Sequence, residues 1–193
     1  MNSDIWQWEK GEIPSDLCDY IVDTINKNEF KKGKTGGWGE EAELQPSKRE
    51  VDMQFSNANW INALLCGYIR YANGANFHYN LSDTDRELAQ ISKYLKDDFY
   101  QRHIDYGDSQ ALTRKLSLTV QLSDENDYEG GDLRFYSGVW NPHIELEEPF
   151  SQASRGKGSV IVFDSRTVHE VTPVTSGTRY SLVKWYHGDE PLK

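Results

Sequence analysis

The sequence predicts an α+β fold in which helices come first and a mainly β structure follows. Two amphipathic helical patterns lie before residue 72, and short runs of strand-like sequence follow one another from about residue 88 onward. Glycine-rich turns separate these runs, and the chain carries no internal repeat. We therefore expect an antiparallel β-sandwich or jelly roll that is buttressed by N-terminal helices.

Length and composition favour one domain with a real hydrophobic core. The chain has 193 residues, of which 37% are hydrophobic and 12% aromatic. We expect residues 1–87 to form a helical support and residues 88–187 a β-core. The sequence has neither a run of about 20 apolar residues nor the basic-then-apolar start of a signal peptide. Cys18 and Cys66 lie in apolar helical patterns and are interpreted as buried thiols, so a cytoplasmic protein without a membrane partner is expected.

The charge balance argues against nucleic acid as the main partner. Lys and Arg number 21 against 31 Asp and Glu, which gives a net charge of -10. Such an acidic chain is a poor match for a nucleic-acid backbone. A local basic patch at residues 27–34 is interpreted as a solvated helix end and loop.

Both helices are predicted from apolar residues spaced three or four apart. The first follows Pro14-Ser15-Asp16, which offers an N-cap, and carries Leu17, Ile21 and Ile25 on one face. The second runs from about Asn57 to Tyr71. Between them, Lys31–Glu50 is rich in glycine and charge and has no periodicity, which is typical of either a mobile functional lid or a disordered loop.

The clearest strand is predicted around residues 115–122. Leucine and valine at the even positions alternate with Lys, Ser, Thr and Gln at the odd ones, which indicates a half-buried strand. Four shorter runs follow, at Asp132–Tyr136, Ser159–Phe163, Thr167–Val171 and Arg179–Tyr186. Glycine-rich turns at residues 129–132 and 155–158 separate them.

Two histidines and a carboxylate form a candidate metal site. His103 and Asp105 are two residues apart, so on a strand their side chains share a face. His169, in a later strand-like run, can supply a second imidazole from across the sandwich. This set leaves coordination positions open, as in the facial triad of non-haem Fe(II) oxygenases, whereas a structural zinc site recruits four ligands. The alternative is a surface pair on a strand, because a bare His-x-Asp is common by chance.

Arg179 is a candidate anchor for a carboxylate. It lies ten residues after His169, at the start of the last apolar-alternating run. A guanidinium presents a fork of donors that matches a carboxylate, which suits a dicarboxylate co-substrate that also chelates iron. The alternative is an ordinary charge at the edge of a strand.

These motifs together resemble the prolyl 4-hydroxylase branch of the Fe(II)/2-oxoglutarate dioxygenases, most closely the oxygen-sensing and bacterial prolyl hydroxylases. The similarity covers residues 88–187 and is carried by Tyr100-x-x-His103-x-Asp105, Gly130-Gly131-Asp132-Leu133, His169 and Arg179 through Trp185. The resemblance implies a double-stranded β-helix with His103, Asp105 and His169 as iron ligands. It also implies that Arg179 and Tyr94 bind 2-oxoglutarate, and that Tyr100, Arg114 and Trp185 lie around the substrate. No role is assigned to His187.

The family implies Fe(II), 2-oxoglutarate and O2 as cofactor and co-substrates, and suggests ascorbate as an accessory reductant. The expected reaction hydroxylates a prolyl residue in a peptide or protein and releases succinate and CO2. In the glycine-rich segment, Trp38 offers an apolar surface for a prolyl ring, and Arg49 with Asp52 resembles a charged motif that follows the substrate loop in the family. Two alternatives stay open. One is a target other than proline: a free amino acid, another side chain or a nucleobase, the last of which fits the net charge of -10 poorly. The other is a catalytically silent binding module. The oligomeric state cannot be derived from the sequence.

Overall fold

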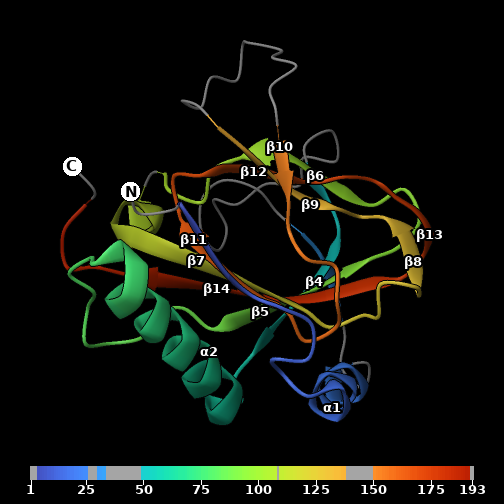
Figure 1. Ribbon diagram of the computed structural model, residues 1–193, viewed down its shortest axis with the longest axis horizontal. Coiled ribbons are helices and arrows are strands. Elements are labelled where there is room, and N and C mark those ends of the chain that lie inside the picture. Colours follow the sequence, from blue (N-terminus) through green and yellow to red (C-terminus); the bar gives the residue numbers. More distant parts are fainter. Residues whose placement is uncertain (1–3, 26–29, 34–48, 108, 138–149, 192–193) are drawn as a thin grey trace.

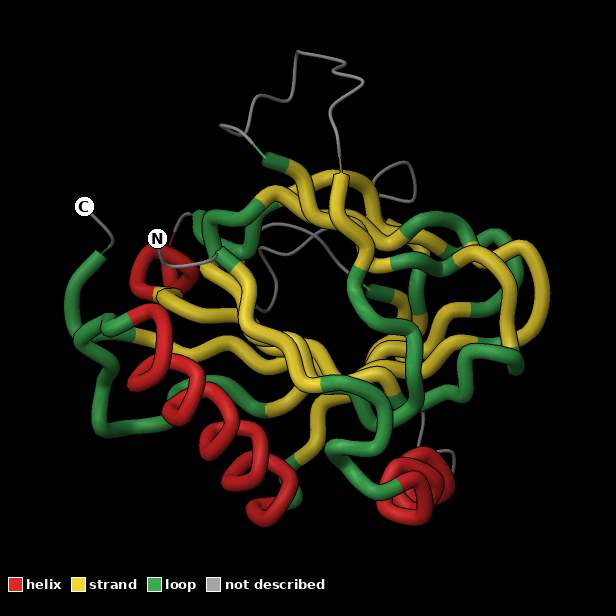
Figure 2. The backbone as a smooth tube through the Cα atoms, in the orientation of Figure 1, coloured by secondary structure: helices red, strands yellow, loops and turns green. Residues whose placement is uncertain are grey.

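The computed structural model describes residues 4–25, 30–33, 49–107, 109–137 and 150–191 of the chain. It is mainly β: two sheets face each other, and two helices lie on the outer side of the larger sheet (Figures 1 and 2). The helices are α1 (Ser15–Ile25) and α2 (Asn59–Ala72), and α2 continues into one turn of π-helix at Asn73–Phe77. Neither is long and apolar enough to cross a membrane.

The larger sheet has the order β1-β11-β7-β14-β5-β4-β2, and every neighbouring pair in it is antiparallel. The smaller sheet has the order β10-β9-β12-β6-β3, and β8 pairs with β13 beside it. The strands of the larger sheet are β1 (Ile5–Trp8), β2 (Lys31–Lys32), β4 (Asp52–Ser56), β5 (Ala89–Tyr94), β7 (Arg114–Gln121), β11 (Val160–Asp164) and β14 (Arg179–His187). Those of the smaller sheets are β3 (Arg49–Glu50), β6 (Phe99–His103), β8 (Tyr128–Gly130), β9 (Leu133–Tyr136), β10 (Phe150–Gln152), β12 (Val168–Val171) and β13 (Val174–Gly177), and a 3-10 turn covers Ser109–Thr113.

The N-terminal part contributes strands as well as the expected helices. Strand β1 pairs with β11 at one edge of the larger sheet, and β4 pairs with β5. The rings of Trp6 and Trp8 in β1 pack against Tyr71 of α2, so aromatic contacts hold this short strand against the helix. Helix α1 also differs at its start, because the amide of Cys18 donates to the Pro14 carbonyl and Ser15 is already helical.

Both faces of β7 are buried, so the prediction of a half-buried strand is wrong. Its Leu116, Leu118 and Val120 pack with the helices in the main hydrophobic cluster. Its Ser117 and Thr119 are also buried, and they face the space between the two sheets, where Thr119 lines a pocket. Apolar and polar residues do alternate along β7, but the polar face of the strand lies against the polar space between the sheets instead of water.

The remaining strand predictions are confirmed to within one or two residues, and α1 and α2 are confirmed as helices. Of the two cysteines, Cys18 is buried, whereas Cys66 is only half-buried. The two ends of Lys31–Glu50 form the short strands β2 and β3, and residues 34–48 lie outside the described part of the chain.

Candidate active site

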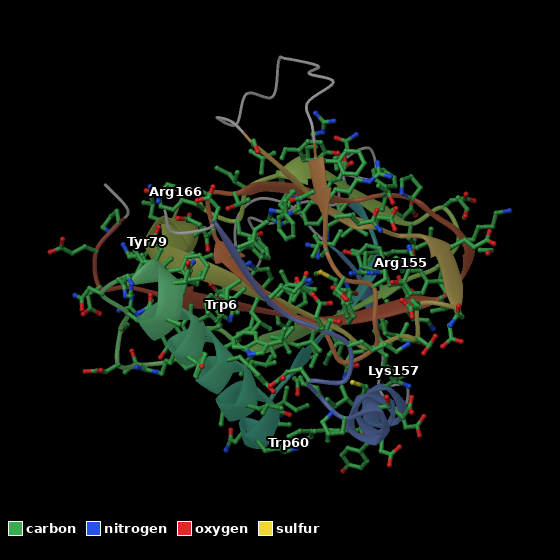
Figure 3. The ribbon with its side chains drawn as sticks, viewed as in Figure 1. Trp6, Trp60, Tyr79, Arg155, Lys157 and Arg166 are labelled. Atoms are coloured by element: carbon green, nitrogen blue, oxygen red, sulfur yellow. The ribbon has the colours of Figure 1, made fainter. Side chains whose placement is uncertain are left out.

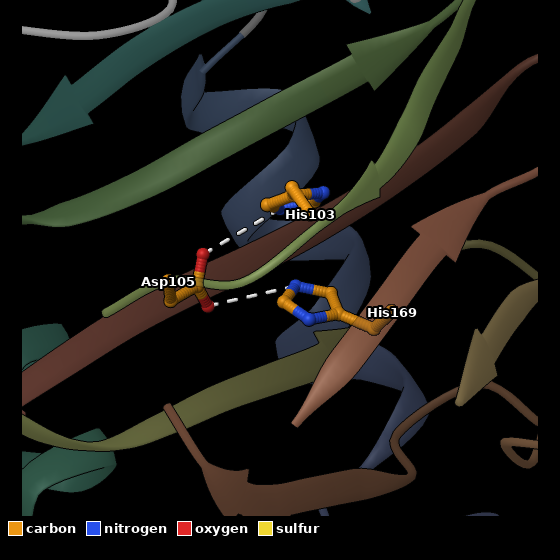
Figure 4. Close-up of side chains that lie close together, drawn as sticks. All are labelled: His103, Asp105 and His169. Carbon is orange, nitrogen blue, oxygen red and sulfur yellow. Dashed lines mark ion pairs between the residues drawn. The ribbon is translucent and has the colours of Figure 1, made fainter. Parts of the chain in front are cut away.

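The three candidate metal ligands come together between the sheets (Figure 4). His103 is the last residue of β6, and His169 of β12 lies directly opposite it in the register of the smaller sheet. Asp105 lies on a bend just after β6, so the two ligands do not share one strand as expected. Its carboxylate reaches both imidazoles, with Oδ1 at 3.6 Å from His103 Nε2 and Oδ2 at 3.6 Å from His169 Nε2.

Backbone carbonyls fix the tautomer of both histidines. His103 Nδ1 lies 2.7 Å from the Gln101 carbonyl oxygen, and His169 Nδ1 lies 2.9 Å from that of Thr167. A carbonyl only accepts hydrogen bonds, so Nδ1 carries the proton and the lone pair of Nε2 is directed at the carboxylate. Two lone pairs and an anion then face one point, and a bound cation relieves their repulsion.

The protonation states agree with this arrangement. Burial, together with the neighbouring His103, lowers the pKa of His169 to about 4, so its imidazole is neutral near pH 7. Burial alone would raise the pKa of Asp105, but the imidazoles of His169 and His103, whenever they carry a second proton, and the nearby Arg114 hold it below its ordinary value. Two imidazoles and one carboxylate are a donor set that fits Fe(II) and leaves open positions.

A pocket extends from the triad between the two sheets. Five further residues singled out in the sequence line it, namely Arg49, Tyr94, Tyr100, Arg179 and Trp185. Trp38 lies outside the described residues. The structure thus brings most of the expected site residues to one cavity.

Arg179 is a buried cation in this pocket. Only 1% of the residue is exposed, and Tyr94 lies opposite it in the β5–β14 pairing, with the Arg179 Cζ 5.1 Å from the Tyr94 ring centre. The guanidinium donates from Nη2 to Gln121 Oε1 at 3.0 Å and from Nη1 to Ser181 Oγ at 3.4 Å, and its Nε has no hydrogen-bond partner within the described part of the chain. Among the described residues, no Asp or Glu pairs with it. A buried, uncompensated guanidinium favours a carboxylate ligand.

Aromatic side chains form the wall next to the triad. The Tyr100 ring stacks on His103 with 3.6 Å between ring centres, and the Arg49 guanidinium lies over the other face of Tyr100 at 4.5 Å. Trp185 contributes a second aromatic surface, and its buried Nε1 has no hydrogen-bond partner in the described structure. This wall suits an apolar ring that also offers a hydrogen-bond acceptor nearby.

Arg114 contacts the pocket through Trp185, because its guanidinium lies 4.2 Å from the centre of the Trp185 ring. It is bidentate with Glu87, at 2.7 and 2.6 Å, and donates to the Asp105 carbonyl at 3.2 Å. His187 completes this buried network, with Nε2 at 2.6 Å from Glu87 Oε1. Through Arg114, this network contacts the Trp185 ring and the Asp105 backbone from outside the pocket.

Sequence reasoning missed Gln121 and Glu87. Gln121 carried a signal, since it is a polar residue on the alternating strand two positions from Thr119, but the pattern alone places it in water. Glu87 lies in a loop just before β5 and has no local pattern that sets it apart. Its partners come from β7 and β14, so only the tertiary fold reveals it.

Comparison with known proteins gives a family. Residues 89–187, just over half of the chain, match the model of the 2OG-Fe(II) oxygenase superfamily. A PKHD-type hydroxylase of Synechococcus sp. (strain CC9605) is 37% identical over 95 residues, which cover 49% of this chain and 39% of the relative. A PKHD-type hydroxylase of Idiomarina loihiensis is 25% identical over 184 residues, which cover 90% of this chain and 73% of the relative. The matched stretch is thus well under half the length of the Synechococcus relative.

Solved structures show the same fold at low identity. A Pseudomonas putida prolyl-4-hydroxylase aligns with a TM-score of 0.70 and 18% identity, over 96% of this chain and 92% of its own. A Trichoplax adhaerens prolyl hydroxylase, in complex with a peptide fragment of the hypoxia inducible factor oxygen degradation domain, aligns with a TM-score of 0.74 and 17% identity, over 96% and 84%. The family match and the site geometry agree, and the chain belongs to the 2OG-Fe(II) oxygenase superfamily.

Proposed function

We propose that this chain is an Fe(II)- and 2-oxoglutarate-dependent dioxygenase that hydroxylates prolyl residues in a peptide or protein, with release of succinate and CO2. One observation supports this reaction class most directly. A two-histidine, one-carboxylate cluster shares a pocket with the buried guanidinium of Arg179, which has no counter-charge in the described structure. The family model supports the same chemistry.

In this proposal each residue of the site has one task. His103, Asp105 and His169 hold Fe(II), which when bound supplies the activation of O2 at the expense of 2-oxoglutarate. Arg179 neutralises the distal carboxylate of 2-oxoglutarate, and Gln121 holds the guanidinium in place through its 3.0 Å hydrogen bond. Tyr94 closes the same end of the pocket. The buried walls keep water away from the reacting atoms.

The aromatic wall supports a prolyl target. Tyr100 and Trp185 both line the pocket beside the triad, and their faces suit a compact apolar ring. Arg49 and Arg114 each lie over one of these aromatic rings and are proposed to hold them in position next to the substrate. Trp38 is proposed as a further substrate contact. The structural likeness to a prolyl hydroxylase in complex with a peptide agrees with this assignment.

The fold around the site is proposed to be a double-stranded β-helix. Antiparallel strands β11, β7, β14 and β5 on one side and β9, β12 and β6 on the other enclose the pocket, and the metal ligands lie at the smaller sheet. This arrangement supports a jelly roll with the metal held inside the barrel.

The test is hydroxylation of proline-containing peptides by protein that was purified without oxygen and loaded with Fe(II). We expect a mass gain of one oxygen atom that requires 2-oxoglutarate and is absent with His169→Ala. Succinate formation without a prolyl product would indicate another target, whereas no conversion of 2-oxoglutarate would indicate a silent binding module. Dependence on ascorbate stays a prediction that the same assay can measure.

A further inference from the structure

The turn between β11 and β12 holds two of the three candidate metal ligands through its backbone. The Ser165 carbonyl accepts hydrogen bonds from the amides of Asp105 and Tyr106, both at 2.9 Å. The Thr167 carbonyl accepts the hydrogen bond from His169 Nδ1, at 2.9 Å. His103 is held differently, by the Gln101 carbonyl of its own strand. The turn therefore sets the position of the Asp105 carboxylate relative to the His169 imidazole.

Asp164, the last residue of β11, closes this turn. Its Oδ1 accepts from the amide of Arg166 at 2.8 Å and from Arg166 Nε at 3.0 Å, and its Oδ2 accepts from Arg166 Nη2 at 2.8 Å. Its carbonyl accepts from the amide of Thr167 at 2.8 Å. The Tyr79 hydroxyl donates to Oδ2 and accepts from Arg166 Nη2 at 2.9 Å (Figure 3). One carboxylate thus determines the shape of the turn.

The turn is also attached to the larger sheet. A change at Asp164 is therefore expected to shift the Ser165 and Thr167 carbonyls. The amide of Ser165 donates to the Lys115 carbonyl of β7 at 3.0 Å, and the Ser165 and Ser117 hydroxyls lie 3.0 Å apart. Only 7% of Asp164 is exposed. Its carboxylate is therefore part of the interior support of the metal centre.

We propose that Asp164, acting with Arg166 and Tyr79, is a positioning residue for the metal centre. It keeps the Ser165 and Thr167 carbonyls where they orient Asp105 and His169, and it thereby determines metal affinity. The inference rests on the proposed role of the triad as metal ligands. Partners that orient metal ligands from behind typically change metal affinity or activity by about 10- to 100-fold when they are mutated.

The test uses Co(II) as the probe and the full chain, with the visible absorption of the bound ion as the readout. We expect Asp164→Asn to bind Co(II) about 10- to 100-fold more weakly and to change the absorption spectrum of the bound ion. Arg166→Gln and Tyr79→Phe are expected to shift the affinity in the same direction by smaller factors. The Arg166 side chain is 45% exposed, so Arg166→Gln is expected to fold and is measured in its place if Asp164→Asn does not fold.

Asp132→Asn is the matched control. Asp132 is also largely buried and pairs with Arg155 and Arg134, but it makes no described contact with the turn or the triad. We expect it to lower the melting temperature and to leave the Co(II) affinity unchanged.

The outcomes separate this inference from the proposed function. Wild-type Co(II) affinity and spectrum in Asp164→Asn and Arg166→Gln, with only a lower melting temperature, would show that the cluster merely stabilises the fold. Wild-type Co(II) affinity in His169→Ala would instead overturn the assignment of the triad itself.

Discussion

Replacing Arg179 with methionine is expected to remove tight binding of 2-oxoglutarate while leaving the protein folded. Methionine is close to the arginine stem in length, so it fills the buried space but removes the charge. The guanidinium is 1% exposed and faces a pocket in which no described carboxylate pairs with it. Loss of one partner of a buried charge pair costs about 2–5 kcal/mol. We expect a loss of about 2–4 kcal/mol in the binding free energy of 2-oxoglutarate, because the ligand keeps its contacts with the metal. The dissociation constant of 2-oxoglutarate should then rise roughly 30- to 1000-fold.

The stability of this variant provides an independent check. No described residue forms a hydrogen bond with the buried Nε of Arg179, so the described structure compensates this cation poorly. An apolar replacement of similar volume at such a position is often neutral or stabilising. We therefore expect the free energy of unfolding of the ligand-free protein to stay level or rise, as measured by urea denaturation.

The binding assay is calorimetry without oxygen, with Mn(II) in place of Fe(II). 2-Oxobutyrate serves as the control ligand, because it has the same 2-oxo acid end but lacks the distal carboxylate. We expect Arg179→Met to lose affinity for 2-oxoglutarate and to bind 2-oxobutyrate as the wild type does. An unchanged dissociation constant for 2-oxoglutarate, or an equal loss for both ligands, would refute the role of Arg179.

Four further changes have definite expected outcomes. Gln121→Glu places an anion where Oε1 now lies 3.0 Å from Arg179 Nη2, so calorimetry should show 2-oxoglutarate binding weakened at least about 10-fold, and unchanged affinity would argue against that pairing. The pKa of His169 is lowered from 6.5 to about 4 in the folded protein. As the pH falls, the His169 imidazole therefore takes up a proton at a higher pH in the unfolded chain than in the folded one. The free energy of unfolding of the metal-free protein should therefore drop by up to about 3 kcal/mol between pH 6.5 and 4, and an equal drop in His169→Gln would contradict the cause. Gly130 has a φ of +67° and an added Cβ would lie 2.2 Å from the Pro173 carbonyl oxygen, so Gly130→Ala should destabilise the protein by at least about 1–3 kcal/mol in urea. Gly67→Ala is its opposite: a Cβ in the middle of α2 meets no atom within 4 Å, and we expect a gain of about 0.5–1 kcal/mol.

The parts of the fold that depend on local pattern were predictable from the sequence. The alternation in β7, the apolar spacing in α1 and α2, and the extended segment that carries His169 all reflect which side chains share a face. The His-x-Asp spacing alone did not identify the site, because His187 and Asp189 repeat it. The triad was identified from its combination with Arg179 and from the resemblance to a known family. The role of Arg179 was inferred from its position ten residues after His169, from the match of a guanidinium to a carboxylate, and from the family resemblance.

The parts that depend on distant contacts could not be predicted. The polar side of β7 is buried because a second sheet packs over it. The alternating sequence pattern does not indicate that a second sheet lies there. Asp105 reaches the histidines from a bend that is held by the Ser165 carbonyl, and a backbone carbonyl has no sequence signature. Glu87 likewise becomes important only because Arg114 and His187 meet it from two other strands.

Iron K-edge anomalous diffraction tests the central claim most directly, on crystals of the wild-type chain grown without oxygen in the presence of Fe(II). We predict one strong anomalous peak about 2.0–2.2 Å from His103 Nε2, from His169 Nε2 and from one carboxylate oxygen of Asp105. A peak at any other group of residues, or one farther than about 3 Å from any of these three side chains, would contradict the account.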